Sequence, residues 1–296
     1  HYTICDVFTD QQFGGNQLAV FPHADGLSKK EMQSIAREFN FSESTFVFPG
    51  ENGCTRRVRI FTPVAEMPFA GHPNVGTAFV LATAGELGAV GVGQNIRFLE
   101  DAGIVPISIQ PDEKGALVCE LQAPQQLSLG ETVPVELVAK AVSLDVGDLL
   151  CTNHPPRQAS VGFPFLMAEL RNPDARQKAR VNLPAFEELA ETGIAPDIHL
   201  YVNSRDEFDI RARMFAPFVG VGEDPATGSA NCALAGLLAH LDGSQSGDYA
   251  WRVAQGVEMG RPSVLSARAR KTEGKVEATW IGGRCVLVSE GKLYLD

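Results

Sequence analysis

An internal repeat is the feature of this sequence that most restricts the folds available to it. Short segments of the first half recur in the second half, and in the best-matched pair two arginines, a phenylalanine and a proline coincide at one offset. Similarity of this kind is the signature of one structural unit used twice. The matching pairs are RVRIFTP (57–63) with RARMFAP (211–217), STFVF (44–48) with IHLYV (198–202), GNQLAVF (15–21) with GFPFLMA (162–168), and, after a two-residue slip, PFAGHPNVGTAFVLA (68–82) with DPATGSANCALAGLLA (224–239).

Each copy contains one amphipathic and one apolar helical pattern. The segment 27–40 has Ser28 as a candidate N-cap and a buried face at Met32, Ile35 and Phe39, and the segment 182–193 is its counterpart. The segments 72–85 and 227–241 are instead apolar nearly all round, as are helices enclosed by protein.

The predicted fold class is α+β. We expect two pseudo-symmetric lobes, each a curled, mostly antiparallel sheet around a central apolar helix. The expected lobes are residues 1–120, completed by a last strand near 290–296, and residues 121–296, with the polar segment 121–134 as the linker. From Ser263 onward the residues alternate as in strands, and turns are predicted at 272–274, 282–283 and 289–291.

The amino-acid composition excludes some classes of binding partner. The 296 residues carry a formal net charge of -11 and no long basic run, so neither nucleic acid nor an anionic membrane surface is expected as a partner. No stretch reaches about 18 apolar residues, which predicts no membrane span. The six cysteines form no C-x-x-C pair and have no zinc-ligand spacing, so we expect buried free thiols, no metal site and a reducing cytoplasm.

The two loops that precede the apolar helices are candidate halves of one site. A pseudo-twofold axis would let them face each other across an interlobe cleft, where the unpaired amides of two helix N-termini could bind a small anionic metabolite. Gly71 and Gly228 would let a ligand approach the backbone. No P-loop or dinucleotide motif is present, so no nucleotide cofactor is expected.

Each polar residue in these segments also has a simpler structural interpretation. Asp224 before Pro225 is a typical N-cap pair, and Ser229 could cap the same helix. His72 could be a structural histidine, and Glu43 a solvated turn residue. The loop acids Glu66 and Glu223 are also interpreted as solvated.

Taken together, the motifs FSEST, FTPVAEMPFAGHPNVGTA, GEDPATGSA and QGVEMGRPS closely resemble the PhzF-like family, named for the phenazine-biosynthesis isomerase. The resemblance covers essentially the whole chain and departs from the family at Gln17, where a proline is usual. It implies a fold like that of diaminopimelate epimerase, and a possible homodimer. It also implies that Glu43 carries the proton. The substrate site is then lined by Gly71, His72, Asp224, Gly228 and Ser229.

The resulting hypothesis is a cofactor-independent isomerase that moves a proton between two carbons of a small carboxylate-bearing substrate. The alternatives are an epimerase or racemase of an amino-acid derivative and a non-catalytic binding protein with the same cleft. A racemase that uses two thiols is disfavoured, because Cys232 lies one turn inside its apolar helix. The loops 152–158 and 171–177 are expected to form part of the pocket wall.

Overall fold

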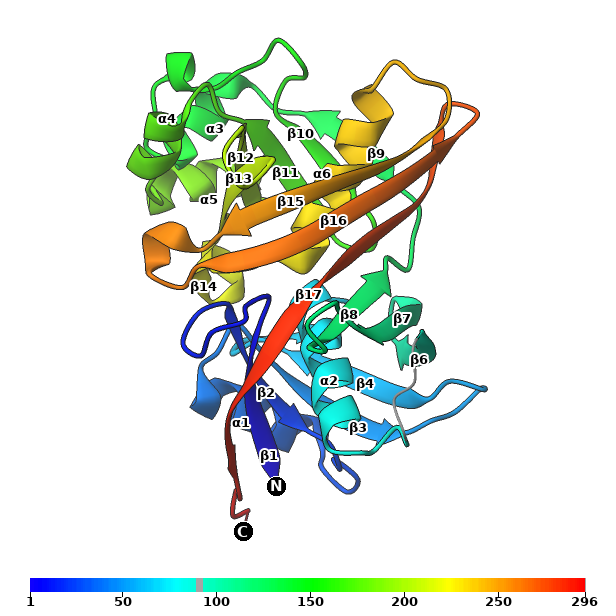
Figure 1. Ribbon diagram of the computed structural model, residues 1–296. Coiled ribbons are helices and arrows are strands. Elements are labelled where there is room, and N and C mark those ends of the chain that lie inside the picture. The colour runs from blue at the N-terminus through cyan, green and yellow to red at the C-terminus, as the bar shows by residue number, and fades with distance from the viewer. Residues whose placement is uncertain (89–92, 296) are drawn as a thin grey trace.

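The computed structural model describes residues 1–88 and 93–295 and shows two halves stacked on each other (Figure 1). One helix is enclosed by strands in each half: α2 (Gly71–Thr83) in the first and α6 (Gly228–Leu241) in the second. The other helices are α1 (Lys29–Phe39), α3 (Val135–Ala141), α4 (Pro173–Lys178) and α5 (Leu183–Glu191), with short 3-10 turns η1 (Val146–Asp148), η2 (Pro217–Val219) and η3 (Val257–Met259).

The strands form one continuous mixed sheet of seventeen members. Among the described residues four pairings are parallel, two in each half: β2 with β3, β4 with β6, β11 with β12, and β13 with β15. The strands are β1 (Tyr2–Val7), β2 (Asn16–Phe21), β3 (Glu43–Pro49), β4 (Arg56–Phe61), β5 (Glu66–Met67), β6 (Gln94–Glu100), β7 (Gly103–Pro111), β8 (Leu117–Gln122), β9 (Ser128–Thr132), β10 (Arg157–Ser160), β11 (Pro164–Glu169), β12 (Ile198–Asn203), β13 (Ile210–Ala216), β14 (Val221–Asp224), β15 (Gly247–Gln255), β16 (Ser263–Thr272) and β17 (Lys275–Gly291).

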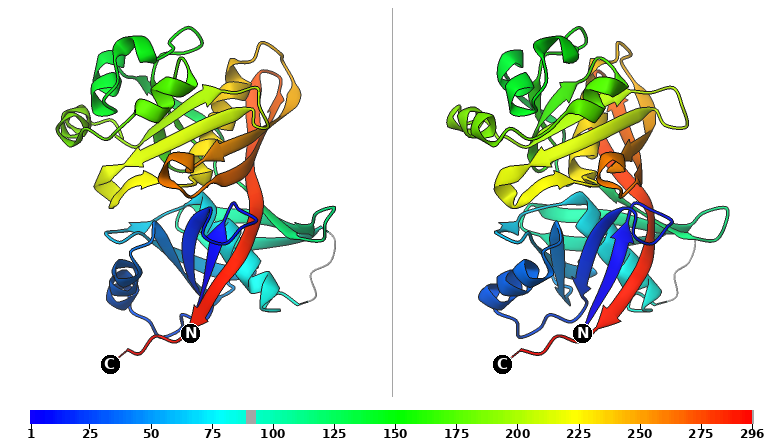
Figure 2. Two further views of the ribbon diagram at one scale, coloured as in Figure 1. Left: turned by 60° about the vertical axis from the view of Figure 1, so that its left-hand side comes forward. Right: turned by 90° about the vertical axis from the view of Figure 1, so that its left-hand side faces the viewer.

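The long strand β17 joins the two halves into one sheet. It pairs first with β16, then with β8, and its segment from Cys285 to Gly291 pairs with β1 (Figure 2). The strand that returns to the first half therefore begins before the predicted region 290–296. A turn does lie at Glu273 and Gly274, both of which have positive φ.

The turns predicted at 282–283 and 289–291 are wrong, because both segments lie inside β17. The two glycines at 282 and 283 serve close packing instead. A Cβ on Gly282 would come within 2.8 Å of the Cβ of Glu120, and one on Gly283 within 2.7 Å of the ring of Phe8. Glycine here marks a position inside a paired strand with no room for a side chain, not a change of direction.

The central helices are enclosed as predicted. Every residue of α2 from Gly71 to Ala82 is buried, and α6 is buried from Gly228 to Leu237. Cys232 faces Thr279 inside this core with its Sγ 3.2 Å from the hydroxyl, and burial raises the pKa of its thiol to about 12. The Cys232 side chain is therefore part of the hydrophobic core, as its sequence position predicts.

The repeat extends to individual contacts. Arg59 forms a bidentate ion pair with Glu66, with N–O distances of 2.6 and 3.0 Å. Arg213 forms the equivalent bidentate pair with Glu223, at 2.7 and 2.8 Å. The interpretation of both glutamates as solvated loop acids is therefore wrong. Each supports the strand from which its arginine projects.

The outer elements agree with the sequence in part. Ser28 caps α1 through a capping box with Glu31, as its spacing predicts. Asn182 is the N-cap of α5, but its side chain makes no capping bond. The predicted linker 121–134 is not merely a connection, since it contains the end of β8 and all of β9, which pairs with β10.

Candidate active site

Residues from both halves line a small cleft with a cavity volume of about 40 Å³. Its wall combines apolar side chains with three carboxyl groups, those of Glu43, Asp197 and Asp224. The remaining lining residues are Ser42, Thr62, Met67, Phe69, Ala70, Phe163, Phe165, Met214, Ala216, Thr227 and Ser229. A mostly apolar enclosure with a few polar groups is the usual form of a small-molecule site.

Glu43 is the first residue of β3, and its carboxyl group turns into this cleft. Only 15% of its side chain is exposed, and its Oε2 atom is buried without a hydrogen-bond partner among the described residues. Burial raises the pKa of this carboxyl well above its usual range, and the nearby Asp224 raises it further. The environment therefore favours a proton on Glu43 near neutral pH.

His72 lies behind Glu43, in the first turn of α2. Its Nδ1 atom is 3.4 Å from Oε2 of Glu43, and 3% of its side chain is exposed. Burial lowers the pKa of the imidazole to about 4, although Asp224 acts in the opposite direction. The pair is therefore a neutral histidine beside a protonated carboxyl. His72 is not among the residues that line the cleft, and its contact with a substrate stays a prediction.

Asn16 connects these groups to the second half of the chain. Its amide nitrogen donates to Oδ1 of Asp224 at 2.8 Å and to the carbonyl of Ala226 at 3.0 Å, and it lies 3.2 Å from Nδ1 of His72. An amide has only two hydrogens, and Asp224 and Ala226 take them at the shorter distances. The Nδ1 atom of His72 is then left without a donor from Asn16 and lies 3.4 Å from Oε2 of Glu43.

Asp224 is held on three sides. Its carboxyl accepts hydrogen bonds from Ser42 Oγ at 2.7 Å, from Asn16 and from Thr227 Oγ1 at 2.5 Å. It is the last residue of β14, and the N-cap of α6 is Thr227, so the capping interpretation of Asp224 is wrong. Asp224 instead ties the two halves together at the cleft.

The helix N-termini do not face each other across the cleft as predicted, because they touch. A Cβ on Gly71 would lie 2.5 Å from the backbone nitrogen of Ser229, and one on Gly228 would lie 3.0 Å from the Cα of Gly71. The two glycines permit this head-to-head contact and are not among the cleft residues, and their role in binding a ligand stays a prediction. Ser229 does line the cleft and presents the start of α6 to it.

The walls of the second half differ from those expected. Neither 152–158 nor 171–177 contributes to the cleft, and Phe163, Phe165 and Met214 do so instead. Sequence reasoning also missed Asp197, a carboxyl residue directly before β12. The repeat contained the signal, because Glu43 stands directly before STFVF and Asp197 directly before IHLYV.

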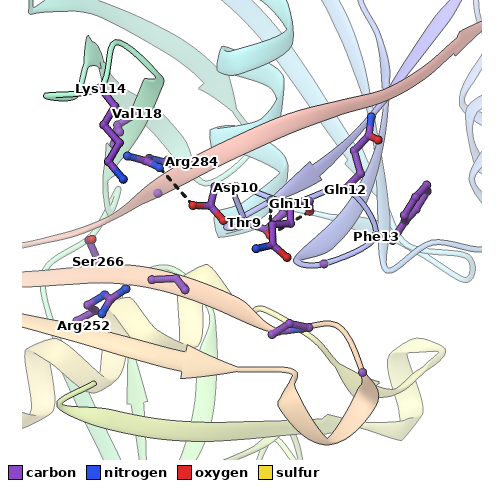
Figure 3. A pocket seen from close by; sticks show the side chains of 15 residues that line it. Thr9, Asp10, Gln11, Gln12, Phe13, Lys114, Val118, Arg252, Ser266 and Arg284 are labelled. Atoms are coloured by element: carbon purple, nitrogen blue, oxygen red, sulfur yellow. Dashed lines mark hydrogen bonds and ion pairs between the residues drawn. The ribbon is translucent and has the colours of Figure 1, made fainter. Parts of the chain in front are cut away.

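A second, larger hollow lies beside β17, away from these carboxyl groups. Figure 3 shows Arg284 reaching toward Asp10 there, with Lys114, Arg252 and Ser266 on the surrounding walls. Arg284 pairs with both Asp10 and Asp112, so its charge is already balanced. This hollow has more volume but no unpaired buried acid, and the interlobe cleft is therefore the stronger candidate active site.

No cluster of three or more potential metal ligands occurs within residues 1–88 and 93–295. The same part of the chain has no helix that is both long and apolar enough to cross a membrane.

The structure is thus an α+β protein of two halves joined by one mixed sheet, with a candidate site where the halves meet. Residues 5–291 match the PhzC-PhzF family, described as phenazine biosynthesis-like protein, and the chain belongs to this family. It is 36% identical to trans-2,3-dihydro-3-hydroxyanthranilate isomerase of Pseudomonas aeruginosa, with 99% of each chain covered. It is 38% identical to an uncharacterised isomerase of Mesorhizobium japonicum, covering 100% of this chain and 99% of that one.

Solved structures agree with this assignment. The Bacillus anthracis phenazine biosynthesis protein of the PhzF family has a TM-score of 0.87 at 26% identity, covering 99% of this chain and 98% of that one. A hydroxyproline epimerase from Agrobacterium vitis shares the fold with a TM-score of 0.65 at 13% identity, covering 97% and 88% of the two chains. The chain is thus an isomerase of the PhzC-PhzF family.

Proposed function

We propose that the protein is a cofactor-independent isomerase in which Glu43 transfers a proton to or from carbon atoms of a small substrate that bears a carboxylate. The observation that carries this proposal is the buried, unpartnered carboxyl oxygen of Glu43 at the wall of the interlobe cleft. Burial raises the pKa of this carboxyl well above its usual range, so it holds a proton that it can give to a carbon atom and take back.

The start of α6 supports a carboxylate-bearing substrate. Ser229 lines the cleft in the first turn of this helix, where backbone amides lack intrahelical partners and carry partial positive charge. Lysine and arginine are absent from the described cleft wall, so the helix start is the feature that would attract an anion. Among known substrates, the trans-2,3-dihydro-3-hydroxyanthranilate of the Pseudomonas aeruginosa relative has the required carboxylate and conjugated ring.

The roles of the other residues follow from their contacts. Asp224 and Asn16 hold the two halves in register, and His72 orients the carboxyl group of Glu43. Of the five residues expected to bind substrate, we propose that Ser229 and Asp224 contact it. The other three, Gly71, His72 and Gly228, would support the site from behind.

The test is the Glu43→Gln variant, which keeps the shape of the side chain and removes the transferable proton. With trans-2,3-dihydro-3-hydroxyanthranilate in D₂O, the unmodified enzyme should place deuterium on carbon with a shift of the double bonds. The variant should lose about 10²–10⁴ in turnover while its ligand affinity changes little. The exposed Glu113→Gln is the matched control, with unchanged turnover expected.

Isotope incorporation separates the alternatives. Inversion at a labelled carbon without a double-bond shift would indicate an epimerase, and saturable binding without exchange would indicate a binding protein. Near-normal turnover by Glu43→Gln would rule out the assignment of Glu43. If the unmodified enzyme ignores this substrate, metabolites bound to protein purified from its natural host, identified by mass spectrometry, provide the next candidates.

A further inference from the structure

We propose that Arg261 is a positioning residue of the isomerase reaction, which acts by holding Asn16 and Asp224 in contact beside the cleft. Arg261 is not among the residues that line the cleft, so it acts on the reaction through other residues. The inference rests on the proposed function, because it takes the interlobe cleft as the active site. It goes beyond that function by assigning a role to a residue outside the cleft.

The side chain of Arg261 comes from the second half of the chain, in the loop between η3 and β16, and binds the first half. Its Nε atom donates to the carbonyl oxygen of Gly15 at 2.9 Å, and its Nη2 atom donates to that of Gly14 at 2.6 Å. Nη2 also pairs with Oδ1 of Asp6 at 2.6 Å, and only 2% of the Asp6 side chain is exposed. The guanidinium group therefore fastens the end of the loop 8–15 to the second half.

The backbone of the loop 8–15 depends on contacts of this kind. Phe8 and Phe13 have φ values of 63° and 71°. Positive φ is unfavourable for bulky residues, so it persists only where the surroundings hold the chain. The amide of Phe13 donates to Oδ2 of Asp6 at 2.7 Å, so both oxygens of this carboxylate bind the loop or its arginine. Asn16 follows directly as the first residue of β2, and the loop end therefore sets its position.

The backbone of Pro262 reinforces the fastening made by Arg261. Its carbonyl oxygen accepts a hydrogen bond from the backbone nitrogen of Gly15 at 3.0 Å. A Cβ on Gly14 would lie 3.1 Å from the same oxygen, so glycine permits the close approach of the two segments. The residue before Asn16 is thus held by a side chain and by a backbone group of the second half.

Ser263 holds the other partner of the contact. Its Oγ atom donates to the carbonyl oxygen of Pro225 at 2.9 Å, and Pro225 directly follows Asp224. The segment 261–263 therefore binds the chain next to Asn16 and the chain next to Asp224 at the same time. Because it holds both neighbours, this segment sets the separation of the two residues.

The contact that this segment positions lies beside Glu43. Asn16 donates to Oδ1 of Asp224 at 2.8 Å and lies 3.2 Å from Nδ1 of His72. The same Nδ1 atom is 3.4 Å from Oε2 of Glu43, and the charge of Asp224 raises the pKa of that carboxyl. A shift of Asn16 would therefore change both the support and the electrostatic surroundings of Glu43. A displacement of about 1 Å in an active site can lower the rate by about 100-fold.

The decisive test is a double-mutant cycle in kcat with trans-2,3-dihydro-3-hydroxyanthranilate as the substrate. Arg261→Ala alone should lower kcat by about 10- to 100-fold, with KM changed by less than about threefold. In an Asn16→Ala background the same substitution should lower kcat by less than about threefold, because Arg261 acts through Asn16. Losses that multiply in the double variant would overturn the proposal, since a purely structural role of Arg261 would be independent of Asn16.

A conservative variant covers the case in which the buried carboxylate of Asp6, left without its cation, prevents folding. In Arg261→Lys the single nitrogen can replace Nη2 at Asp6 but cannot also replace Nε at the carbonyl of Gly15. We expect native folding by circular dichroism and a kcat lower by about 3- to 10-fold. Wild-type kcat in both Arg261→Ala and Arg261→Lys would overturn the inference.

Arg268→Ala is the matched control. Arg268 lies in β16, forms an ion pair with Glu120 and is not among the cleft residues. Its replacement should leave kcat unchanged, whereas a loss as large as that of Arg261→Ala would show that removing any such ion pair is sufficient and would overturn the proposal. If Glu43→Gln is inactive while the Arg261 variants keep wild-type kcat, only this inference fails. If Glu43→Gln stays active, the proposed function itself fails.

A second measurement needs no turnover. Crystal structures of Arg261→Ala and Arg268→Ala give the distance between Nδ2 of Asn16 and Oδ1 of Asp224. We expect this distance to exceed about 3.5 Å, the limit of a hydrogen bond, in Arg261→Ala. It should stay at 2.8 Å in the control. An unchanged distance in Arg261→Ala would overturn the inference, even if the enzyme does not act on trans-2,3-dihydro-3-hydroxyanthranilate.

Discussion

Glu100 offers a sharp test of the repeat, because its replacement by glutamine should stabilise the protein. This residue ends β6, is 7% exposed, and neither carboxyl oxygen has a hydrogen-bond partner among the described residues. Burial raises the pKa of this carboxyl well above its usual range, with a smaller lowering by Asn74 and a raising by Asp101. Glu100 is therefore a neutral acid in the folded protein.

The second half already contains the proposed replacement. Arg57 pairs with Leu99 as Arg211 pairs with Ala254, so the counterpart of Glu100 is Gln255. Gln255 accepts a hydrogen bond from Asn231 at 2.8 Å and donates to the carbonyl of Asp224 at 2.8 Å. The side-chain oxygen of Asn74 is buried without a partner, and the amide introduced by Glu100→Gln could donate to it.

The magnitude follows from linkage. The unfolded chain ionises glutamate near pH 4.3, whereas the folded chain retains the proton, so the stability contributed by Glu100 is full below that pH and falls as the pH rises toward the folded pKa. At neutral pH the loss is at most about 3–4 kcal/mol, given 1.36 kcal/mol per pH unit. Glutamine removes this dependence, so we expect Glu100→Gln to gain about 1–3 kcal/mol near pH 8 and almost nothing near pH 4.

Urea denaturation of both proteins between about pH 4 and pH 8 measures the difference directly. The reverse exchange, Gln255→Glu, should lose stability progressively over the same range, and the exposed Glu113→Gln should change nothing. A gain that is independent of pH, or a loss of stability near pH 8, would refute both the neutral state of Glu100 and its equivalence to Gln255.

Three further predictions concern the site. Gly71→Ala should abolish most turnover and destabilise the fold, because the new Cβ would lie 2.5 Å from the backbone nitrogen of Ser229. Gly147→Ala is the control, since its Cβ would have no neighbour within 4 Å, and it should keep both activity and melting temperature. Asn16→Ala should lower kcat by roughly 10–100-fold with retained folding by circular dichroism, since it removes the hydrogen bonds from Asn16 to Asp224 and Ala226 beside His72. Unchanged kcat would contradict this role. A thiol reagent should titrate Cys151 alone in the folded protein and all six cysteines after unfolding, with activity retained; inactivation would revive a thiol mechanism.

The sequence predicted the fold well where its patterns report on packing. The apolar segments at 72–85 and 227–241 do become buried helices, and the repeat is present in strand register and in the arginine–glutamate pairs. The sequence-based prediction failed where one residue type occurs in two different structural roles. Glycine in a turn and glycine at a closely packed strand position look alike in a sequence, so the pair at 282–283 was predicted as a turn although it lies within β17.

The site was predicted unevenly for a related reason. Glu43, Asp224 and Ser229 do line one cleft, as expected from motifs that precede helices and strands. Gly71, His72 and Gly228 belong to the same motifs but lie behind the cleft surface, because the two helix starts touch. A motif records which residues a site needs, and it does not distinguish those that contact a ligand from those that position the others.

The repeat also explains why Asp197 escaped notice. Sequence comparison between the halves favours residues that stayed the same, such as the arginine, phenylalanine and proline of the two strand ends. At 43 and 197 the two halves differ in side-chain length and share only the carboxyl group, yet the parallel strand pairs bring both residues to the cleft. A repeated unit therefore offers two equivalent positions to compare for each residue of the cleft. The search for functional residues in such a chain should therefore compare the chemical groups at equivalent positions, in addition to the residue types.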